Sequence, residues 1–131
     1  MKLPTNISKG SHKEVAVTFE QLIVSGQIRE AYEKYVSADF RHHNPYFKGD
    51  RESLLLGMEK NATQFADKVY EVKRVLEDGD LVAIHSRLKP KPDMPEIAVV
   101  HIYRFEDDKI AGEWDLGQQV PDNSPNENGL F

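Results

Sequence analysis

The chain has 131 residues, 39% of them hydrophobic, which is enough for one domain with a small core and too few for two domains. The absence of cysteine excludes disulfides, thiolate nucleophiles and thiolate-bound metal sites. A formal net charge of −5 argues against nucleic-acid partners, and the lack of a signal peptide or of a run of roughly 20 apolar residues leads us to expect a cytoplasmic protein without membrane contact.

Helical periodicity dominates the first half of the chain. Ser11 and Glu14 form a capping-box pattern ahead of the first apolar repeat, Gly26 follows its end, and Asp50 is placed to cap a later helix. The helices expected on this basis span about 12–25, about 27–37 and from Asp50 to near residue 66. The segment before Pro45 is expected to be irregular, because proline disfavours helix at the preceding residue.

From Val69 the apolar period changes to two, which is typical of strands. Turn residues such as those around Gly79 divide this half into hairpins. The four expected strands span about 69–77, 81–88, 96–105 and 109–117. Helices followed by hairpin-linked strands predict one α+β domain over 1–131, with a curved antiparallel sheet packed on three N-terminal helices. We expect residues 1–10 to form an N-terminal arm, and we expect the irregular tail over 120–131 either to strap a neighbouring surface or to be disordered.

Both faces of the expected sheet are apolar, although a face exposed to water usually shows alternating polar residues. We therefore expect the helices to cover one face and a second copy of the chain to cover the other. The alternative is a fold that curls enough to bury both faces. The predicted homodimer face carries even-numbered residues: Val82, Ile84, Val100, Ile102 and Trp114.

Three polar residues interrupt the odd-numbered side of these strands: His85, His101 and Asp115. If the hairpins keep the odd sides aligned, these side chains meet in one apolar pocket under the helices. A carboxylate beside imidazoles in such a pocket is suited to acid/base chemistry. His42 or His43 would join them only if the irregular segment that carries these histidines folds over the mouth of the pocket. The alternative is structural: hydrogen-bonded core histidines, with Asp115 capping a turn or pairing with Arg87.

A metal site is a further alternative. Nitrogen and oxygen ligands for zinc or iron are present in His43, His85, His101 and Asp115, but no compact metal-binding spacing connects them. We therefore expect no metal and no other cofactor. The sequence also lacks the glycine-rich phosphate and dinucleotide motifs and the GxSxG pattern of serine hydrolases.

Three segments together resemble the SnoaL-like polyketide cyclase family, within the nuclear transport factor two-like superfamily. They are FRHHNP at 40–45, EDGDLVAIH at 77–85 and IYRFEDDKIAGEWD at 102–115. The resemblance extends over nearly the whole chain. It departs from the family at Glu113, where many relatives carry His, and at His42, where Gln is usual.

The resemblance implies a cone-shaped α+β fold around a cavity, often dimeric, and a cofactor-free intramolecular aldol condensation. In that scheme Asp115 is the general acid/base, while His43 and His85 assist or bind the carbonyl. Our hypothesis is therefore an enzyme acting on a small apolar carbonyl compound by aldol-type cyclisation or a related isomerisation. The expected lining residues of the cavity are His101, Tyr103, Glu113 and Arg87. The alternative hypothesis is a dimeric module that binds a small ligand without turnover.

Overall fold

The computed structural model describes residues 10–131, so the expected N-terminal arm lies outside the described residues except for Gly10. Its helices are α1 (His12–Val24), α2 (Ile28–Tyr35) and α3 (Arg51–Gln64). Its strands are β1 (Val36–His42), β2 (Val69–Asp78), β3 (Leu81–Lys89), β4 (Ile97–Glu106) and β5 (Lys109–Gln119). The mixed α+β class is confirmed, with three helices packed on a curved five-stranded sheet. None of the helices in the described part is long and apolar enough to span a bilayer.

The helix ends follow the local chemistry of the sequence. The Ser11 hydroxyl accepts a hydrogen bond from the backbone N–H of Glu14 at 3.1 Å, and the Asp50 carboxylate accepts one from the N–H of Ser53 at 3.1 Å. Each contact satisfies an N–H that has no partner within its helix. Gly26, at φ +86°, follows α1 in the left-handed region that favours glycine. The caps expected for the first and third helices are therefore confirmed.

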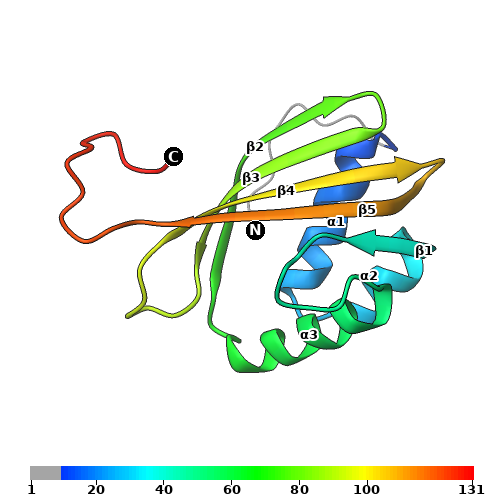
Figure 1. The fold of residues 1–131 in the computed structure, drawn as a ribbon, viewed down its shortest axis with the longest axis horizontal. Helices are drawn as coiled ribbons and strands as arrows, with labels where there is room; N and C mark the ends of the chain where they lie inside the picture. The colour runs from blue at the N-terminus through cyan, green and yellow to red at the C-terminus, as the bar shows by residue number, and fades with distance from the viewer. Residues whose placement is uncertain (1–9) are drawn as a thin grey trace.

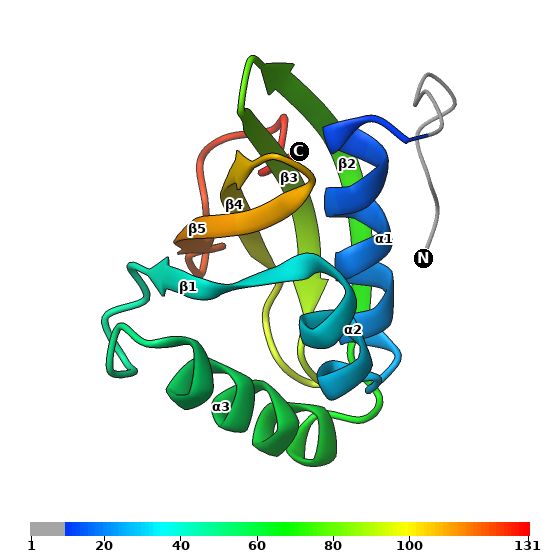
Figure 2. The same cartoon turned by 90° about the vertical axis from the view of Figure 1, so that its right-hand side faces the viewer.

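The sheet has the strand order β1-β5-β4-β3-β2, and β2 to β5 form consecutive antiparallel hairpins. Figure 1 shows these strands fanning out from one end, with α1 behind them and α2 and α3 below. Seen from the side in Figure 2, the sheet curves around one space, with α1 along β2 and α3 closing the lower end. The fold is therefore a cone whose interior is shared by the sheet and all three helices.

A fifth strand, β1, stands where the sequence predicted the end of a helix and an irregular segment. Residues 36–42 run parallel to β5, with Val36 paired with Ile110 and His42 with Glu113. Val36 and Phe40 are buried, so the segment contributes apolar side chains to the core. The prediction of helix at 36–37 was wrong because pairing with residues more than 70 positions later outweighs the local helical pattern. β1 also brings the loop after His42 beside β5.

The loop between β1 and α3 packs closely against α3, where the Phe47 ring lies against Gly57. A Cβ added to Gly57 would lie 2.3 Å from Cε1 of Phe47, so only glycine leaves room for this ring. His42 is buried and fixes the other end of the loop, since its Nε2 donates to the Lys48 carbonyl at 2.7 Å and its Nδ1 accepts from the Asn44 N–H at 3.1 Å. These contacts position Asn44 at the interior of the cone.

The register between β3 and β4 determines which side chains point inward. Ile84 lies opposite His101, whereas His101 lies opposite Asp115 on β5. Directly opposed residues share a face, so the even-numbered residues of β3 face the same way as the odd-numbered residues of β4 and β5. Val82 and Ile84 are accordingly fully buried in the core. Their assignment to an outer dimer face was wrong, while Val100, Ile102 and Trp114 do lie on the outer face.

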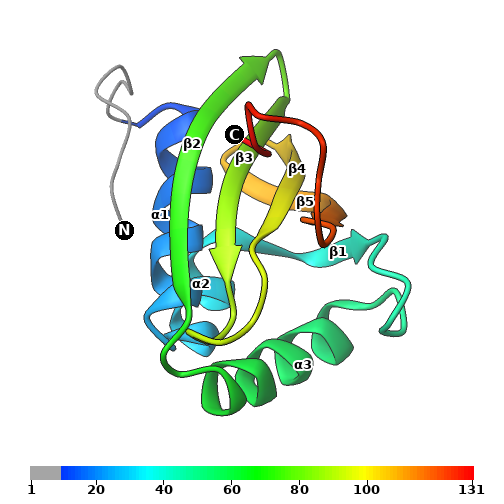
Figure 3. The same cartoon turned by 90° about the vertical axis from the view of Figure 1, so that its left-hand side faces the viewer.

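The segment 120–131 contains no helix or strand. The Val120 N–H donates to the Glu96 carbonyl at 3.0 Å, and the chain then turns back along the sheet. Figure 3 shows the C-terminus lying beside β3. There the Phe131 ring lies 5.8 Å from the His85 ring, between centroids, and 5.6 Å from Lys73 Nζ. In this structure the tail is a strap on the outer face.

Candidate functional site

The interior of the cone contains a cavity of about 460 Å³. Its apolar wall comes from α1, α3 and the inward side of the sheet, with Phe19, Leu54 and Met58 among the lining residues. Its polar wall comes from α1, β4, β5 and the loop after β1. A mostly apolar cavity with a few convergent polar groups is the usual form of a small-molecule site.

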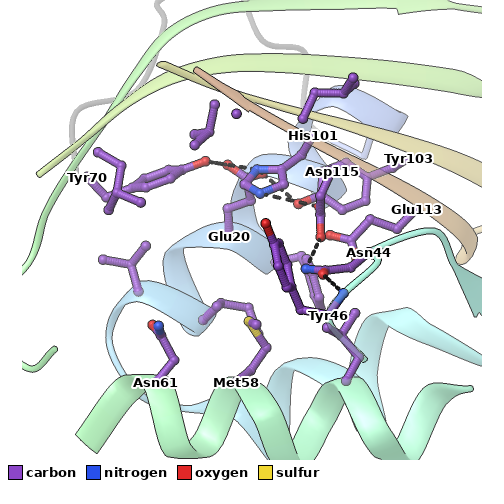
Figure 4. A pocket seen from close by; sticks show the side chains of 18 of the residues that line it. Glu20, Asn44, Tyr46, Met58, Asn61, Tyr70, His101, Tyr103, Glu113 and Asp115 are labelled. Atoms are coloured by element: carbon purple, nitrogen blue, oxygen red, sulfur yellow. Dashed lines mark hydrogen bonds and ion pairs between the residues drawn. The ribbon is translucent and has the colours of Figure 1, made fainter. Parts of the chain in front are cut away.

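The buried Glu20 and the partly buried His101 form the centre of the polar wall (Figure 4). The Glu20 carboxylate accepts hydrogen bonds from the hydroxyls of Tyr70 and Tyr103, each at 2.6 Å, and lies 2.9 Å from His101 Nδ1. Burial opposes the charged imidazolium, but the Glu20 carboxylate outweighs it and, with Asp115, raises the pKa of His101 to about 10. His101 is therefore an imidazolium at neutral pH, with Nε2–H turned toward Asp115.

Asp115 presents one paired and one unpaired oxygen. Its Oδ2 accepts a hydrogen bond from the Asn44 side-chain amide at 3.0 Å. Its Oδ1 lies 3.5 Å from His101 Nε2, too far for a good hydrogen bond, and this buried atom has no hydrogen-bond partner within residues 10–131. A buried carboxylate oxygen that faces an imidazolium but accepts no hydrogen bond is costly in a purely structural role and is suited to accept a proton from a bound molecule.

Glu113 lies beside Asp115 and is buried. Burial, together with the neighbouring Asp115 carboxylate, raises the pKa of Glu113 to about 8. Glu113 therefore carries its proton at neutral pH and is a hydrogen-bond donor. The site thus has two donors, His101 and Glu113, beside one acceptor oxygen on Asp115.

The raised pKa values of His101 and Glu113 predict that the free energy of unfolding decreases as the pH increases. Between pH 6.5 and 8 the folded protein retains protons on His101 and Glu113 that the unfolded chain releases, because both folded pKa values lie above the unfolded ones. A folded state that binds more protons loses stability as pH rises, by about 2 kcal/mol over this interval. Urea unfolding at several pH values measures this slope. Glu113→Gln removes one of the two groups and should make it shallower, whereas a slope that is flat or positive in the native chain would contradict the assignment.

Two of the residues expected in the pocket lie outside it, on the outer face of β3. His85 is opposite Val100, its Nδ1 contacts the Arg74 guanidinium, and burial together with Arg74 lowers its pKa. Arg87 forms an ion pair with Glu96. The expectation that His85 shares a face with His101 was wrong, because the β3–β4 register pairs odd with even positions. The structure therefore gives no geometric support for a role of His85 or Arg87 in the pocket.

His42, at the end of β1, and His43, in the loop after it, do not line the cavity. His43 is exposed, and its ring stacks on Trp114 with the centroids 5.1 Å apart. His42 is buried but engaged with the loop backbone. The next residue, Asn44, supplies the polar group that reaches Asp115. The loop after β1 therefore folds toward the cavity, as a contribution from His42 or His43 would have required, but the group that reaches Asp115 is the Asn44 amide.

Four residues expected at the site do lie together along the cavity: His101, Tyr103, Glu113 and Asp115. The sequence reasoning missed Glu20, Asn44 and Tyr70. A usable signal existed for Glu20, because this charged residue falls beside Phe19 on the side of the helix that carries the buried Ala16. Asn44 and Tyr70 had no comparable signal, since each depends on how a loop or strand end is placed.

The same cluster could hold a divalent cation. Ligand atoms of His101, Glu113 and Asp115 all lie within 4.8 Å of one another. Glu20 at His101 Nδ1 resembles the carboxylates that orient metal-binding imidazoles. Metal binding requires neutral imidazole and ionised carboxylates, however, and here the pKa of His101 is about 10 and that of Glu113 about 8. These protonation states fit a proton-transfer site better than a preformed metal site.

Fold and cavity together place this protein among the cone-shaped α+β proteins that enclose a ligand pocket. The SnoaL-like domain family matches residues 16–113, and the chain belongs to this family. No curated protein sequence matches the chain. IdmH from Streptomyces antibioticus, a proposed polyketide cyclase, is 18% identical at a TM-score of 0.70, and the match covers 82% of this chain and 92% of that one.

Other solved structures share the same architecture. A cystatin-fold protein from Novosphingobium aromaticivorans is 18% identical at a TM-score of 0.71, covering 81% of this chain and 97% of that one. AclR from Streptomyces galilaeus, a proposed hydroxylase, is 22% identical at a TM-score of 0.64, covering 85% and 83%. At these identities the similarity establishes the fold. Relatives with different proposed activities on one fold leave the chemistry to be argued from the site.

Proposed function

We propose that this protein catalyses cofactor-free acid/base chemistry on a small apolar carbonyl compound, as an aldol-type cyclisation or a related isomerisation. The observation that supports it most is the buried Oδ1 of Asp115, which faces the His101 imidazolium and accepts no hydrogen bond from the described residues. A base next to a cationic donor in an apolar cavity has the arrangement needed to form and stabilise an enolate. Membership of the SnoaL-like domain family and the likeness in fold to a proposed polyketide cyclase both agree with this chemistry.

In the proposed step, Asp115 Oδ1 takes a proton from the carbon next to a carbonyl. The electron pair of the broken C–H bond moves into the enolate, whose oxygen accepts hydrogen bonds from His101 Nε2–H and the Glu113 carboxyl. In a cyclisation the enolate carbon then bonds to a second carbonyl carbon of the same molecule, and the new alkoxide receives the proton from Asp115. In an isomerisation Asp115 returns the proton to a different carbon.

Proton abstraction can be tested without knowing the natural substrate. The probe is 2-acetylnaphthalene in D₂O, whose methyl protons exchange for deuterium only through the enolate, and ¹H NMR follows their loss. We expect the protein to accelerate this exchange, and chelation with EDTA to leave the rate unchanged. Binding of the probe without exchange would identify a ligand-binding module instead. If EDTA abolishes the exchange, the reaction depends on a metal ion, and we would assign that ion to His101, Glu113 and Asp115.

We propose further that two copies associate through the outer face of the sheet. Apolar side chains on this face are partly or largely exposed: Leu76, Leu81, Val100, Ile102, Trp114 and Leu116. A second copy would bury a continuous apolar area of this kind. The tail contacts this face at His85, so a second copy would have to bury the part of the face that the tail leaves uncovered.

The expected result is a dimer for the native chain and a monomer for Ile102→Glu, because the buried carboxylate would lack a partner in the interface. Size-exclusion chromatography with light scattering at micromolar concentration measures both. Leu56→Glu is the matched control, since Leu56 is a half-exposed leucine on α3, away from the sheet. A native chain that is monomeric over the same concentrations would refute the dimer.

A further inference from the structure

The cavity has a positively charged group at the end opposite the acid/base cluster. Lys68 lies between α3 and β2, two residues before Tyr70, and both residues line the cavity. Its side chain is partly buried and makes no ion pair or side-chain hydrogen bond with any residue in the described range 10–131. Burial lowers the pKa of Lys68 because no carboxylate offsets it. A lysine held in this way is available to a ligand.

A second donor lies at the same end. Asn61 on α3 lines the cavity, and its side-chain amide is not engaged in a hydrogen bond with other described residues. Figure 4 shows Asn61 and Met58 rising from α3 across the cavity from His101 and Asp115. Leu88, at the end of β3, lines this part of the wall and pairs with Tyr70 on β2. The end near Lys68 therefore combines two polar donors with an apolar surround.

The charges of the cavity are separated along its length. Glu20 and Asp115 place two carboxylates at the end that holds His101, and one imidazolium only partly compensates them. An anionic group on a ligand would be repelled from this end and attracted by the unpaired ammonium of Lys68. The same asymmetry would direct the uncharged carbonyl of that ligand toward His101.

We propose that the cavity binds carbonyl compounds that carry a carboxylate, with Lys68 and Asn61 holding the carboxylate and His101 facing the carbonyl. The carbonyl end rests on the proposed function, whereas the carboxylate end rests on Lys68 and Asn61 alone. Lys68 is then a specificity-determining residue: it selects anionic members among apolar ketones and fixes which end of the molecule meets Asp115.

The experiment uses two probes that differ in one charge, 6-acetyl-2-naphthoate and its methyl ester. Isothermal titration calorimetry with the full chain at pH 7 should give an affinity for the acid about tenfold higher than for the ester, the order of effect expected of a hydrogen bond to a charged group. Lys68→Met should remove this preference while leaving the ester affinity unchanged, and Lys68→Arg should retain it. Lys60→Met is the matched control, because Lys60 is exposed on α3 and does not line the cavity.

Equal binding of acid and ester by the native chain would overturn the proposal, as would a preference that survives Lys68→Met. A mass increase on Lys68 after borohydride treatment would also overturn it, since Lys68 would then bond covalently to the carbonyl. These outcomes leave the exchange reaction of 2-acetylnaphthalene unaffected, so they do not bear on Asp115. Failure to bind either probe would overturn this proposal alone, because the proposed function is decided by the exchange reaction of 2-acetylnaphthalene.

Discussion

Asp115→Asn should reduce enolate formation by about 10²–10⁴-fold, the range expected when a general base is lost. Asparagine has the same shape and keeps an oxygen for the Asn44 amide, but its amide nitrogen cannot accept the proton that Oδ1 is positioned to take. Binding should change little, because the ligand is held mainly by the apolar wall of the cavity. Deuterium exchange of 2-acetylnaphthalene gives the rate, and calorimetry gives the affinity for the same probe.

Asp108→Asn is the matched control for this variant. Asp108 is exposed in the turn between β4 and β5, so its replacement removes the same charge far from the cavity. We expect this control to retain the native exchange rate. If Asp115→Asn binds the probe with native affinity and exchanges it at the native rate, Asp115 is not the base. Enolate formation would then have to be assigned to another group of the cavity.

Local signals in the sequence were sufficient for most of the secondary structure. The caps at Ser11 and Asp50 and the glycine after α1 act within a few residues, so their chemistry is readable without the fold. The strand alternation from Val69 onward likewise reflects a half-buried surface. β1 escaped prediction because its pairing with β5 is a long-range contact, and nothing in residues 36–42 alone favours it over a helix end.

The candidate site shows a sharper division between what was predictable and what was not. Alternation within one strand correctly grouped His101 with Tyr103 on β4 and Glu113 with Asp115 on β5. It could not predict which residues of β3 share a face with His101 on β4, because a shift of one residue in register exchanges the two faces of a strand. His85 was therefore placed inside and Ile84 outside, the reverse of the structure.

The protonation states of Glu113 and His101 could not be predicted from the sequence either. The resemblance led us to expect a histidine at the position of Glu113, and an ionised glutamate there would remove a donor. Burial and the nearby Asp115 keep Glu113 protonated at neutral pH, so the donor is retained by a different chemical group. Likewise, His101 owes its charge to Glu20, which is more than 80 residues away in the chain. Such effects require the folded environment.

Glu20 is the positioning residue on which the charge of His101 depends. Its carboxylate accepts two tyrosine hydroxyls at 2.6 Å and lies 2.9 Å from His101 Nδ1, and both Glu20 and Tyr103 are buried. Glu20→Gln keeps the size of the side chain but replaces one acceptor oxygen with a donor and removes the charge that offsets the burial of the imidazolium. We expect a loss of about 3 kcal/mol in the free energy of unfolding, since buried partners are left unpaired.

The electrostatic role of Glu20 has its own measurement. In Glu20→Gln the pKa of His101 should fall well below its native value of about 10, because burial then opposes the imidazolium with less compensation. NMR titration of the His101 ring resonances follows this change, and the exchange rate at pH 7 should fall with it as the donor to the enolate oxygen loses its charge. Glu33→Gln, at an exposed glutamate of α2, is the matched control and should alter neither quantity. A destabilised Glu20→Gln protein in which His101 still titrates near 10 would restrict Glu20 to a structural role and assign the imidazolium to Asp115 and its surroundings.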